Sequence, residues 1–148
     1  MSDQPEQIIT TLTEDDQNHL AGQRAVVEMY LANEDSKQKY QKAGGKLGTI
    51  RALLQAGTFK PEQTYELQCL GVVLGDAFVQ ELGWEWIIVE EDEYGRNPAV
   101  RVPDTTIILY PLTMISKRVE RGEEVDVFDL FNRIVEMVED VIDSGDYS

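Results

Sequence analysis

Residues 64–89 read TYELQCLGVVLGDAFVQELGWEWIIV, and this stretch decides the fold. Up to Leu82 its apolar residues occupy nearly every face of a helix that we expect to begin at Pro61 and to end at Gly83. A helix that is apolar nearly all round belongs in the centre of a domain. From Trp84 onward, aromatic and β-branched residues are typical of a buried strand. The stretch therefore predicts a central helix that leads directly into a sheet.

Two glycines and one carboxylate stand out on this helix. Gly71 and Gly75 lie four residues apart and leave a smooth groove where another backbone can approach closely. Asp76 is the only charge between Glu66 and Glu81, and a buried carboxylate requires a partner. Its expected partner is one of three cations further along the chain: Arg101, Lys117 or Arg118.

Short strands follow the central helix. We expect strands at residues 84–89, 99–102 and 105–110, joined by a turn at 90–98 and a tight turn at Pro103-Asp104. Sequential strands with short connections favour an antiparallel meander. The sequence therefore predicts three antiparallel strands over about residues 84–110.

Helices are expected on both sides of this meander. Before it, a capping box at Thr13–Asp16 begins a helix that runs to about residue 31, and a short helix spans about 47–56. After it, Pro111 begins a helix that ends at Gly122, and Asp126 caps the last, strongly amphipathic helix. This order predicts an α+β fold. We expect one domain over residues 13–143, with flexible tails at 1–12 and 144–148.

A basic, glycine-containing segment separates the first two helices. Lys37, Lys39, Lys42 and Lys46 lie close together, and the segment ends in Gly44-Gly45-Lys46-Leu47-Gly48. The nucleotide-binding loop needs four residues between its first glycine and a Gly-Lys-Ser/Thr sequence, with a strand before it. That spacing is missing here, so we interpret the glycines as a helix break or hinge.

The composition excludes several classes of function. The 148 residues include 13 basic and 28 acidic side chains, a formal charge of −15. This charge argues against nucleic-acid and anionic-membrane binding, and it suits a basic protein partner. No apolar run in the sequence is long enough to span a bilayer, and the N-terminal residues show no signal peptide, so we expect a cytoplasmic protein.

No catalytic or cofactor-binding pattern is present in the sequence. Cys69 and His19 are the only residues of their types, so the usual zinc site cannot be assembled, and an internal disulfide is excluded. We find no catalytic triad, no dinucleotide fingerprint and no paired carboxylates in a defensible cleft. We therefore expect neither metal nor cofactor, and no enzymatic activity.

One surface is the candidate binding site. The acidic run at residues 90–93 lacks the alternating spacing of a calcium loop and is interpreted as a solvated hairpin. A basic island in the next helix, Lys117-Arg118 with Arg121, contrasts with the acidic chain. We expect a site where this island meets the hairpin. The candidate residues are Asp92, Glu93, Arg96, Arg101, Lys117 and Arg118.

A family resemblance rests on residues in this part of the chain: Leu70-Gly71, Leu74-Gly75, Trp86, Asp92-Glu93-Tyr94-Gly95-Arg96, Pro98-Ala99, Thr105-Thr106-Ile107, Pro111, Lys117-Arg118 and Gly122-Glu123. Over about residues 67–123 the chain resembles the bacterial DUF3806 domain family. The resemblance implies a bacterial origin and a single fold unit. The family has no assigned activity that it could imply.

Three functions remain as hypotheses. The leading one is a non-enzymatic acidic domain that binds a basic protein, such as an immunity-type or antitoxin-like neutraliser. The first alternative is a regulatory domain that binds a small anion or ligand through the Arg/Lys cluster. The second is a structural homodimeric module that pairs through the last helix, and the oligomeric state is left open.

Overall fold

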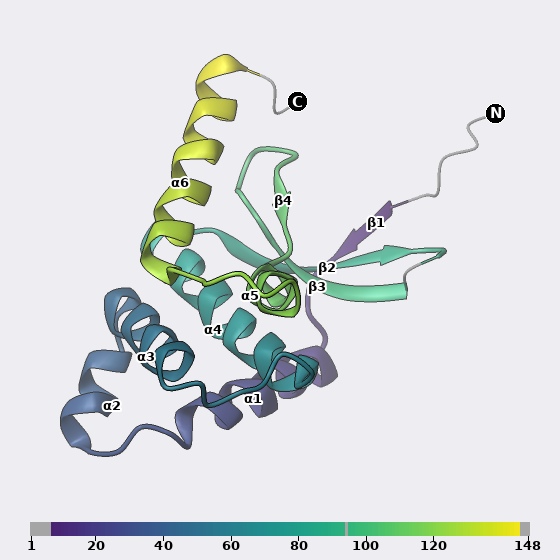
Figure 1. Ribbon diagram of the computed structural model, residues 1–148. Helices are drawn as coiled ribbons and strands as arrows, with labels where there is room; N and C mark the ends of the chain where they lie inside the picture. Colours follow the sequence, from purple (N-terminus) through teal and green to yellow (C-terminus); the bar gives the residue numbers. More distant parts are fainter. Residues whose placement is uncertain (1–6, 94, 146–148) are drawn as a thin grey trace.

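The computed structural model describes residues 7–93 and 95–145, which form six helices and one four-stranded antiparallel sheet (Figure 1). Along the chain the elements are β1 (Gln7–Thr10), α1 (Glu14–Glu28), α2 (Glu34–Tyr40), α3 (Ala43–Gln55), α4 (Thr64–Leu82), β2 (Glu85–Glu91), β3 (Gly95–Arg101), β4 (Ile108–Leu109), α5 (Pro111–Glu120) and α6 (Val127–Ser144). The predicted α+β class is confirmed.

The helix α4 forms the centre of the molecule, as the sequence predicts. It lies between α1, α3 and α5, and it also contacts β2 and β3 (Figure 1). Apolar side chains on several of its faces, including Leu67, Val72 and Phe78, are fully buried. The ring of Phe78 stacks on Trp84 at 5.1 Å and on Phe131 of α6 at 4.8 Å. Burial of its middle turns explains why Asp76 is the only charged residue between Glu66 and Glu81.

The two glycines of α4 mark its closest contacts. A Cβ atom at Gly71 would lie 2.5 Å from the Cα atom of Leu112 and from the carbonyl oxygen of Pro111, at the start of α5. A Cβ at Gly75 would collide with the indole ring of Trp86. The predicted approach of another backbone is confirmed at Gly71, where α5 begins, whereas the close neighbour at Gly75 is a side chain of β2.

The sheet has one strand more than predicted. Its order is β1-β2-β3-β4, and every neighbouring pair is antiparallel. The added strand, β1, pairs with β2 from Gln7 to Thr10. The prediction of a flexible tail over residues 1–12 is therefore wrong for this segment, because backbone hydrogen bonds to the edge of β2 order it.

Two strand boundaries also differ from the prediction. β3 begins at Gly95, because the ladder with β2 continues through residues expected in the turn. β4 is limited to Ile108–Leu109. The hydroxyl of Thr105 donates to the carbonyl of Val102 and accepts from the N–H of Ile107, so the chain still turns where the third strand was expected to start.

The basic segment is helical, which corrects the expected break. Asn33 caps α2 by accepting the N–H of Ser36, and α3 begins at Ala43 instead of about residue 47. Gly44 and Gly45 therefore belong to the first turn of α3. A Cβ at Gly45 would collide with the carbonyl of Lys39, so this glycine allows α2 and α3 to meet tightly.

The C-terminal helices follow the prediction. α5 begins at Pro111, and α6 begins after Asp126, whose carboxylate accepts the N–H of Asp129. Residues 1–6 of the predicted N-terminal tail, Tyr94 of the predicted turn and residues 146–148 of the predicted C-terminal tail lie outside the described residues.

Candidate functional site

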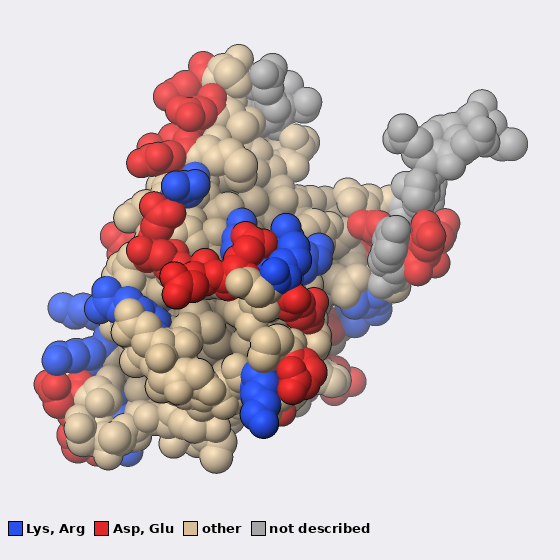
Figure 2. Space-filling model, in the orientation of Figure 1, with Lys and Arg blue, Asp and Glu red and all other residues tan. Residues whose placement is uncertain are grey.

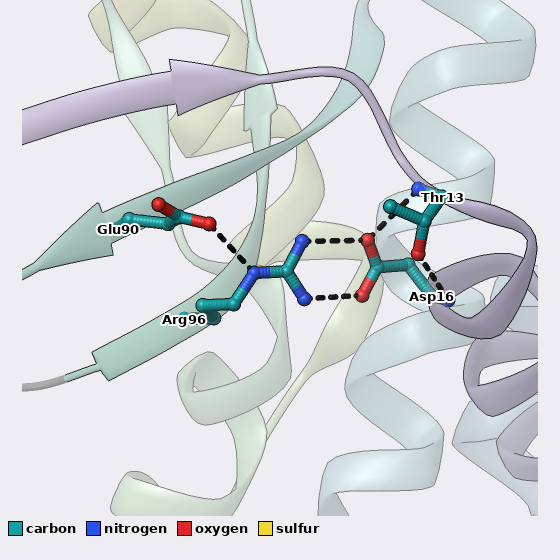
Figure 3. A network of polar contacts seen from close by, with 4 residues as sticks. All are labelled: Thr13, Asp16, Glu90 and Arg96. Carbon is teal, nitrogen blue, oxygen red and sulfur yellow. Dashed lines mark hydrogen bonds and ion pairs between the residues drawn. The ribbon is translucent and has the colours of Figure 1, made fainter.

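Arg96, one of the candidate site residues, is held between two carboxylates (Figure 3). Its Nε donates to Glu90 on β2 at 2.7 Å, and its two terminal nitrogens donate to the two carboxylate oxygens of Asp16 at 2.9 Å each. Asp16 also accepts the N–H of Thr13, while the hydroxyl of Thr13 accepts the N–H of Asp16, which completes the predicted capping box of α1. Arg96 thus ties the first turn of α1 to the β2–β3 hairpin.

This network shifts the pKa values of Asp16 and Arg96 and so favours the charged form of each group. The hydrogen bonds from Arg96, followed by that from the Thr13 backbone, hold the pKa of Asp16 well below its usual range. The hydrogen bonds to Asp16 and Glu90 raise the pKa of Arg96 in turn. Only 13% of the Asp16 side chain is exposed. The arrangement secures the N-terminus of a helix, and it leaves Arg96 engaged with the protein itself.

The other predicted site residues do not gather around Arg96. Arg101 donates to Glu85 at 2.8 Å. Arg118 donates to the carbonyl of Met114 in its own helix at 2.7 Å, and Lys117 is exposed. Asp92 and Glu93 lie exposed in the hairpin turn. Within residues 7–93 and 95–145, no hydrogen bond or ion pair joins any two of these six candidates. The basic island and the hairpin are therefore not joined by a hydrogen bond or an ion pair among these described candidates.

Asp76 forms an ion pair, but with a different cation from those predicted. Its two oxygens accept from Nε and Nη2 of Arg24 on α1, at 2.6 and 2.9 Å. The indole N–H of Trp86 donates to the same carboxylate at 3.0 Å. The prediction of Arg101, Lys117 or Arg118 is therefore wrong, because α1 crosses α4 at Asp76 and covers this position. The pairing raises the pKa of Arg24.

Further polar groups lie near this pair, between α2, α3 and α4. Lys46 donates to the carbonyl of Tyr40 and to the side chain of Gln80, each at 2.8 Å, and its ammonium lies 5.0 Å from the centre of the Tyr40 ring. Burial raises the pKa of Tyr40. These groups engage one another across helix contacts, which is the behaviour of a structural network.

An acidic ridge runs along α6. We use this name for Glu136, Glu139, Asp140 and Asp143, four exposed carboxylates in the C-terminal half of the helix. Figure 2 shows acidic side chains following α6 along one side. Within the described part of the chain, none of the four takes part in an ion pair. Two exposed apolar side chains flank the ridge, Met137 at 48% and Ile142 at 38%.

A basic pocket lies on another face, between α2, α3 and the start of α6. Its volume is about 650 Å³, and the charged residues that line it are Lys39, Lys42 and Arg51. Figure 2 shows basic side chains gathered over α2 and α3, apart from those near α5. The sequence indicates the lysines but not the pocket, because Arg51 and its neighbour Phe128 are brought together only by the packing of α6 on α3.

The described residues also bear on metal binding, membrane insertion and thiol chemistry. No three or more His, Cys, Asp or Glu side chains are placed there to hold a metal ion. No helix in this part of the chain combines the length and apolarity needed to cross a bilayer. Cys69 is fully buried in α4, and burial raises its pKa to about 11. At neutral pH it is a thiol, not a nucleophilic thiolate.

Comparison with known proteins supports the fold and names a family. A protein from Bacteroides thetaiotaomicron VPI-5482, with a crystal structure at 1.50 Å resolution, superposes with a TM-score of 0.69 at 13% sequence identity. The match covers 88% of this chain and 48% of that one, so the chain spans about half the length of that protein. At this identity the likeness shows the fold alone.

Among curated proteins there is no match. The family model described as "Domain of unknown function (DUF3806)" matches residues 46–131, which is more than half of the chain. The match confirms the resemblance. It extends it toward the N-terminus to include most of α3, and toward the C-terminus to include the start of α6. This chain therefore belongs to the family defined by that domain of unknown function, DUF3806.

Proposed function

We propose that this protein is a non-enzymatic binding domain that holds a basic protein partner against the acidic ridge of α6. The observation that carries the proposal is the composition of this helix face. Four carboxylates that form no ion pair with another described residue lie along this face, and two exposed apolar side chains, Met137 and Ile142, flank them on either side. Protein interfaces combine apolar contacts with charged and polar groups, and this face offers both.

The charge of the whole chain supports the same choice of partner. A formal charge of −15 attracts a basic surface over distances of the order of the Debye length, about 8 Å at physiological salt. Such attraction raises the rate of encounter and disfavours acidic partners. A second copy of this chain would place two acidic ridges against each other, which makes a homodimer through this face unfavourable.

The charged groups gathered elsewhere support a role without catalysis. Asp76, Asp16 and Arg96 are held in ion pairs that join helices and strands. Cys69 is buried in its neutral form. A domain that binds a basic surface and does no chemistry on it acts by covering that surface, as an immunity-type or antitoxin-like neutraliser does.

Site-specific crosslinking in the native host tests the proposal. A photoreactive phenylalanine analogue replaces Met137, and in a matched control it replaces Tyr65, which is 54% exposed at the start of α4. We expect one basic protein to crosslink at position 137 and not at position 65. The adduct should weaken with rising salt, because screening reduces the attraction between the two surfaces.

Charge-neutral variants distinguish the effect of the ridge itself from the effect of the protein's net charge. Changing the four ridge residues to Gln or Asn should abolish the adduct. A control with the same change of charge at four other exposed carboxylates should keep it: Glu62, Glu81, Asp92 and Glu93. Loss of the adduct in both variants, or an adduct between two copies of this chain, would contradict the proposal.

A further inference from the structure

We propose that the basic pocket between α2, α3 and α6 is a second binding site, and that its ligand is a small organic anion with an aromatic or apolar body. This site lies apart from the acidic ridge and does not depend on its function. Three features of the pocket carry the inference: its size and apolar wall, the sign of its charge, and its glycine floor.

The size and the wall suit a small molecule. The volume of about 650 Å³ falls within the range of about 300–1,000 Å³ that is usual for ligand pockets. Tyr30, Leu53 and Phe128 contribute aromatic and aliphatic surface. A single inorganic ion would leave most of this surface unused, so the ligand must carry an apolar part.

The charge of the lining is opposite to that of the protein. Lys39, Lys42 and Arg51 line the pocket, and none of its described lining residues is acidic. The sequence shows the same reversal, because residues 36–61 contain six lysines and arginines but no Asp or Glu, in a chain of charge −15. Three cations around one hollow repel one another, and an anion between them would relieve that repulsion.

Two of these cations are available to a ligand. Lys42 forms no ion pair with another described residue. The guanidinium carbon of Arg51 lies 4.7 Å from the centre of the Phe128 ring. Stacking uses the flat face of the guanidinium and leaves its N–H groups free to bind a carboxylate or phosphate in their plane. Lys39 contacts Asp35 at 3.0 Å, but both side chains are more than 70% exposed, and such a pair exchanges easily.

The floor of the pocket is open backbone. Gly44 and Gly48 line it, and a Cβ atom at either would meet nothing within 4 Å. Gly48 lies inside α3, where glycine destabilises a helix relative to alanine, and no packing contact requires it. The first turn of α3 has neither a side-chain cap nor an acidic residue, so its N–H groups add to the attraction for an anion.

The site differs from a nucleotide-binding loop. Lys46, which follows the paired glycines, donates to Tyr40 and Gln80 and does not line the pocket. The cations that face the pocket come instead from α2, the start of α3 and the middle of α3. The rejected sequence motif and the observed pocket are therefore separate features of the same segment.

Titration calorimetry with 1-naphthoate tests the inference, with 1-naphthalenemethanol as the uncharged match and inorganic phosphate as the anion without an apolar body. We expect naphthoate to bind about tenfold or more tightly than either comparison compound. Equal binding of the uncharged alcohol would overturn the role of charge, and equal binding of phosphate would overturn the role of the apolar wall.

Variants locate the binding. Lys42→Glu and Arg51→Glu should each lower the affinity for naphthoate about tenfold or more. Lys60 is exposed and lies outside the pocket, so Lys60→Glu should change this affinity less than about twofold. Gly48→Leu should fill the pocket and abolish binding while thermal unfolding shows an intact fold. Normal binding by Gly48→Leu, or equal weakening by Lys60→Glu, would refute the site. The variant in which the four ridge residues are changed to Gln or Asn should bind naphthoate with unchanged affinity, so this test is independent of the ridge.

Discussion

The same substitution, glycine to alanine, should have opposite effects on stability at two helical positions. At Gly48 a Cβ meets nothing within 4 Å, so alanine adds only its better helix propensity, about 0.5–1 kcal/mol of stabilisation. At Gly71 the same atom would lie 2.5 Å from the backbone of Leu112 and Pro111. We therefore expect Gly48→Ala to stabilise the protein and Gly71→Ala to destabilise it.

The magnitude at Gly71 follows from the displacement that the added atom requires. Ordinary van der Waals contact begins at 3.4 Å, so α4 and α5 must separate locally by about 0.9 Å. Backbone atoms cannot move aside by a change of rotamer, and overpacking of this kind costs about 1–3 kcal/mol. After the gain in helix propensity of about 0.5–1 kcal/mol is subtracted, the net loss is at most about 2.5 kcal/mol, with a central value of about 1 kcal/mol.

Urea unfolding followed by circular dichroism measures both changes. With a slope of about 1–3 kcal/mol per molar urea, the midpoint of Gly71→Ala should fall by roughly 0.5–1 M, and that of Gly48→Ala should rise by a few tenths. Similar slopes in all three proteins would show that the folded states are comparable. A Gly71→Ala midpoint at or above that of the wild type would refute the close approach of α5 to α4.

Three further predictions concern charged and nucleophilic groups. Asp76→Ala should cost about 2 kcal/mol in urea unfolding, less than a fully buried pair because 29% of the Arg24 side chain is exposed, and an Arg24→Met background should remove most of that cost. The folded state lowers the pKa of Asp16. The stability that the ionised Asp16 contributes to the folded protein is therefore fully present above about pH 4 and is lost as the pH falls below that value. Asp16→Asn should therefore flatten the acid limb of stability against pH, and parallel curves for variant and wild type would contradict the network with Arg96. Cys69, with a pKa of about 11, should react with a disulfide reagent at pH 8 only after unfolding in urea, and fast reaction of the native protein would contradict its burial.

Elements with strong local signals were predictable. The caps at Thr13 and Asp126, and Pro111 at the start of α5, mark helix termini through hydrogen bonds and backbone limits that involve neighbouring residues. The central position of α4 followed from its composition, and its small residues at Gly71 and Gly75 indicated close contacts. For these features the energy that decides the structure comes from a few adjacent positions.

Weak local signals gave the errors at β1, α2 and the start of α3. Gln7–Thr10 is too short to indicate a strand by itself, and only its pairing with β2 orders it. The paired glycines were interpreted as a break, yet a helix accepts Gly45 in its first turn because the backbone of Lys39 occupies the space of a side chain. In each case a tertiary contact outweighed local propensity.

The sequence by itself determined the α+β class, the central helix, the family and the acidic character of α6, since each depends on composition or on spacing within one element. Only the tertiary structure decided which charges meet. Asp76 pairs with Arg24, 52 residues away, and Arg96 pairs with Asp16, 80 residues away. With 28 carboxylates and 13 cations, many pairings are chemically equivalent in the sequence. The packing of α1 on α4 and of α6 on α3 selects among them, and it also forms the basic pocket, because hydrophobic burial decides which helix faces come together.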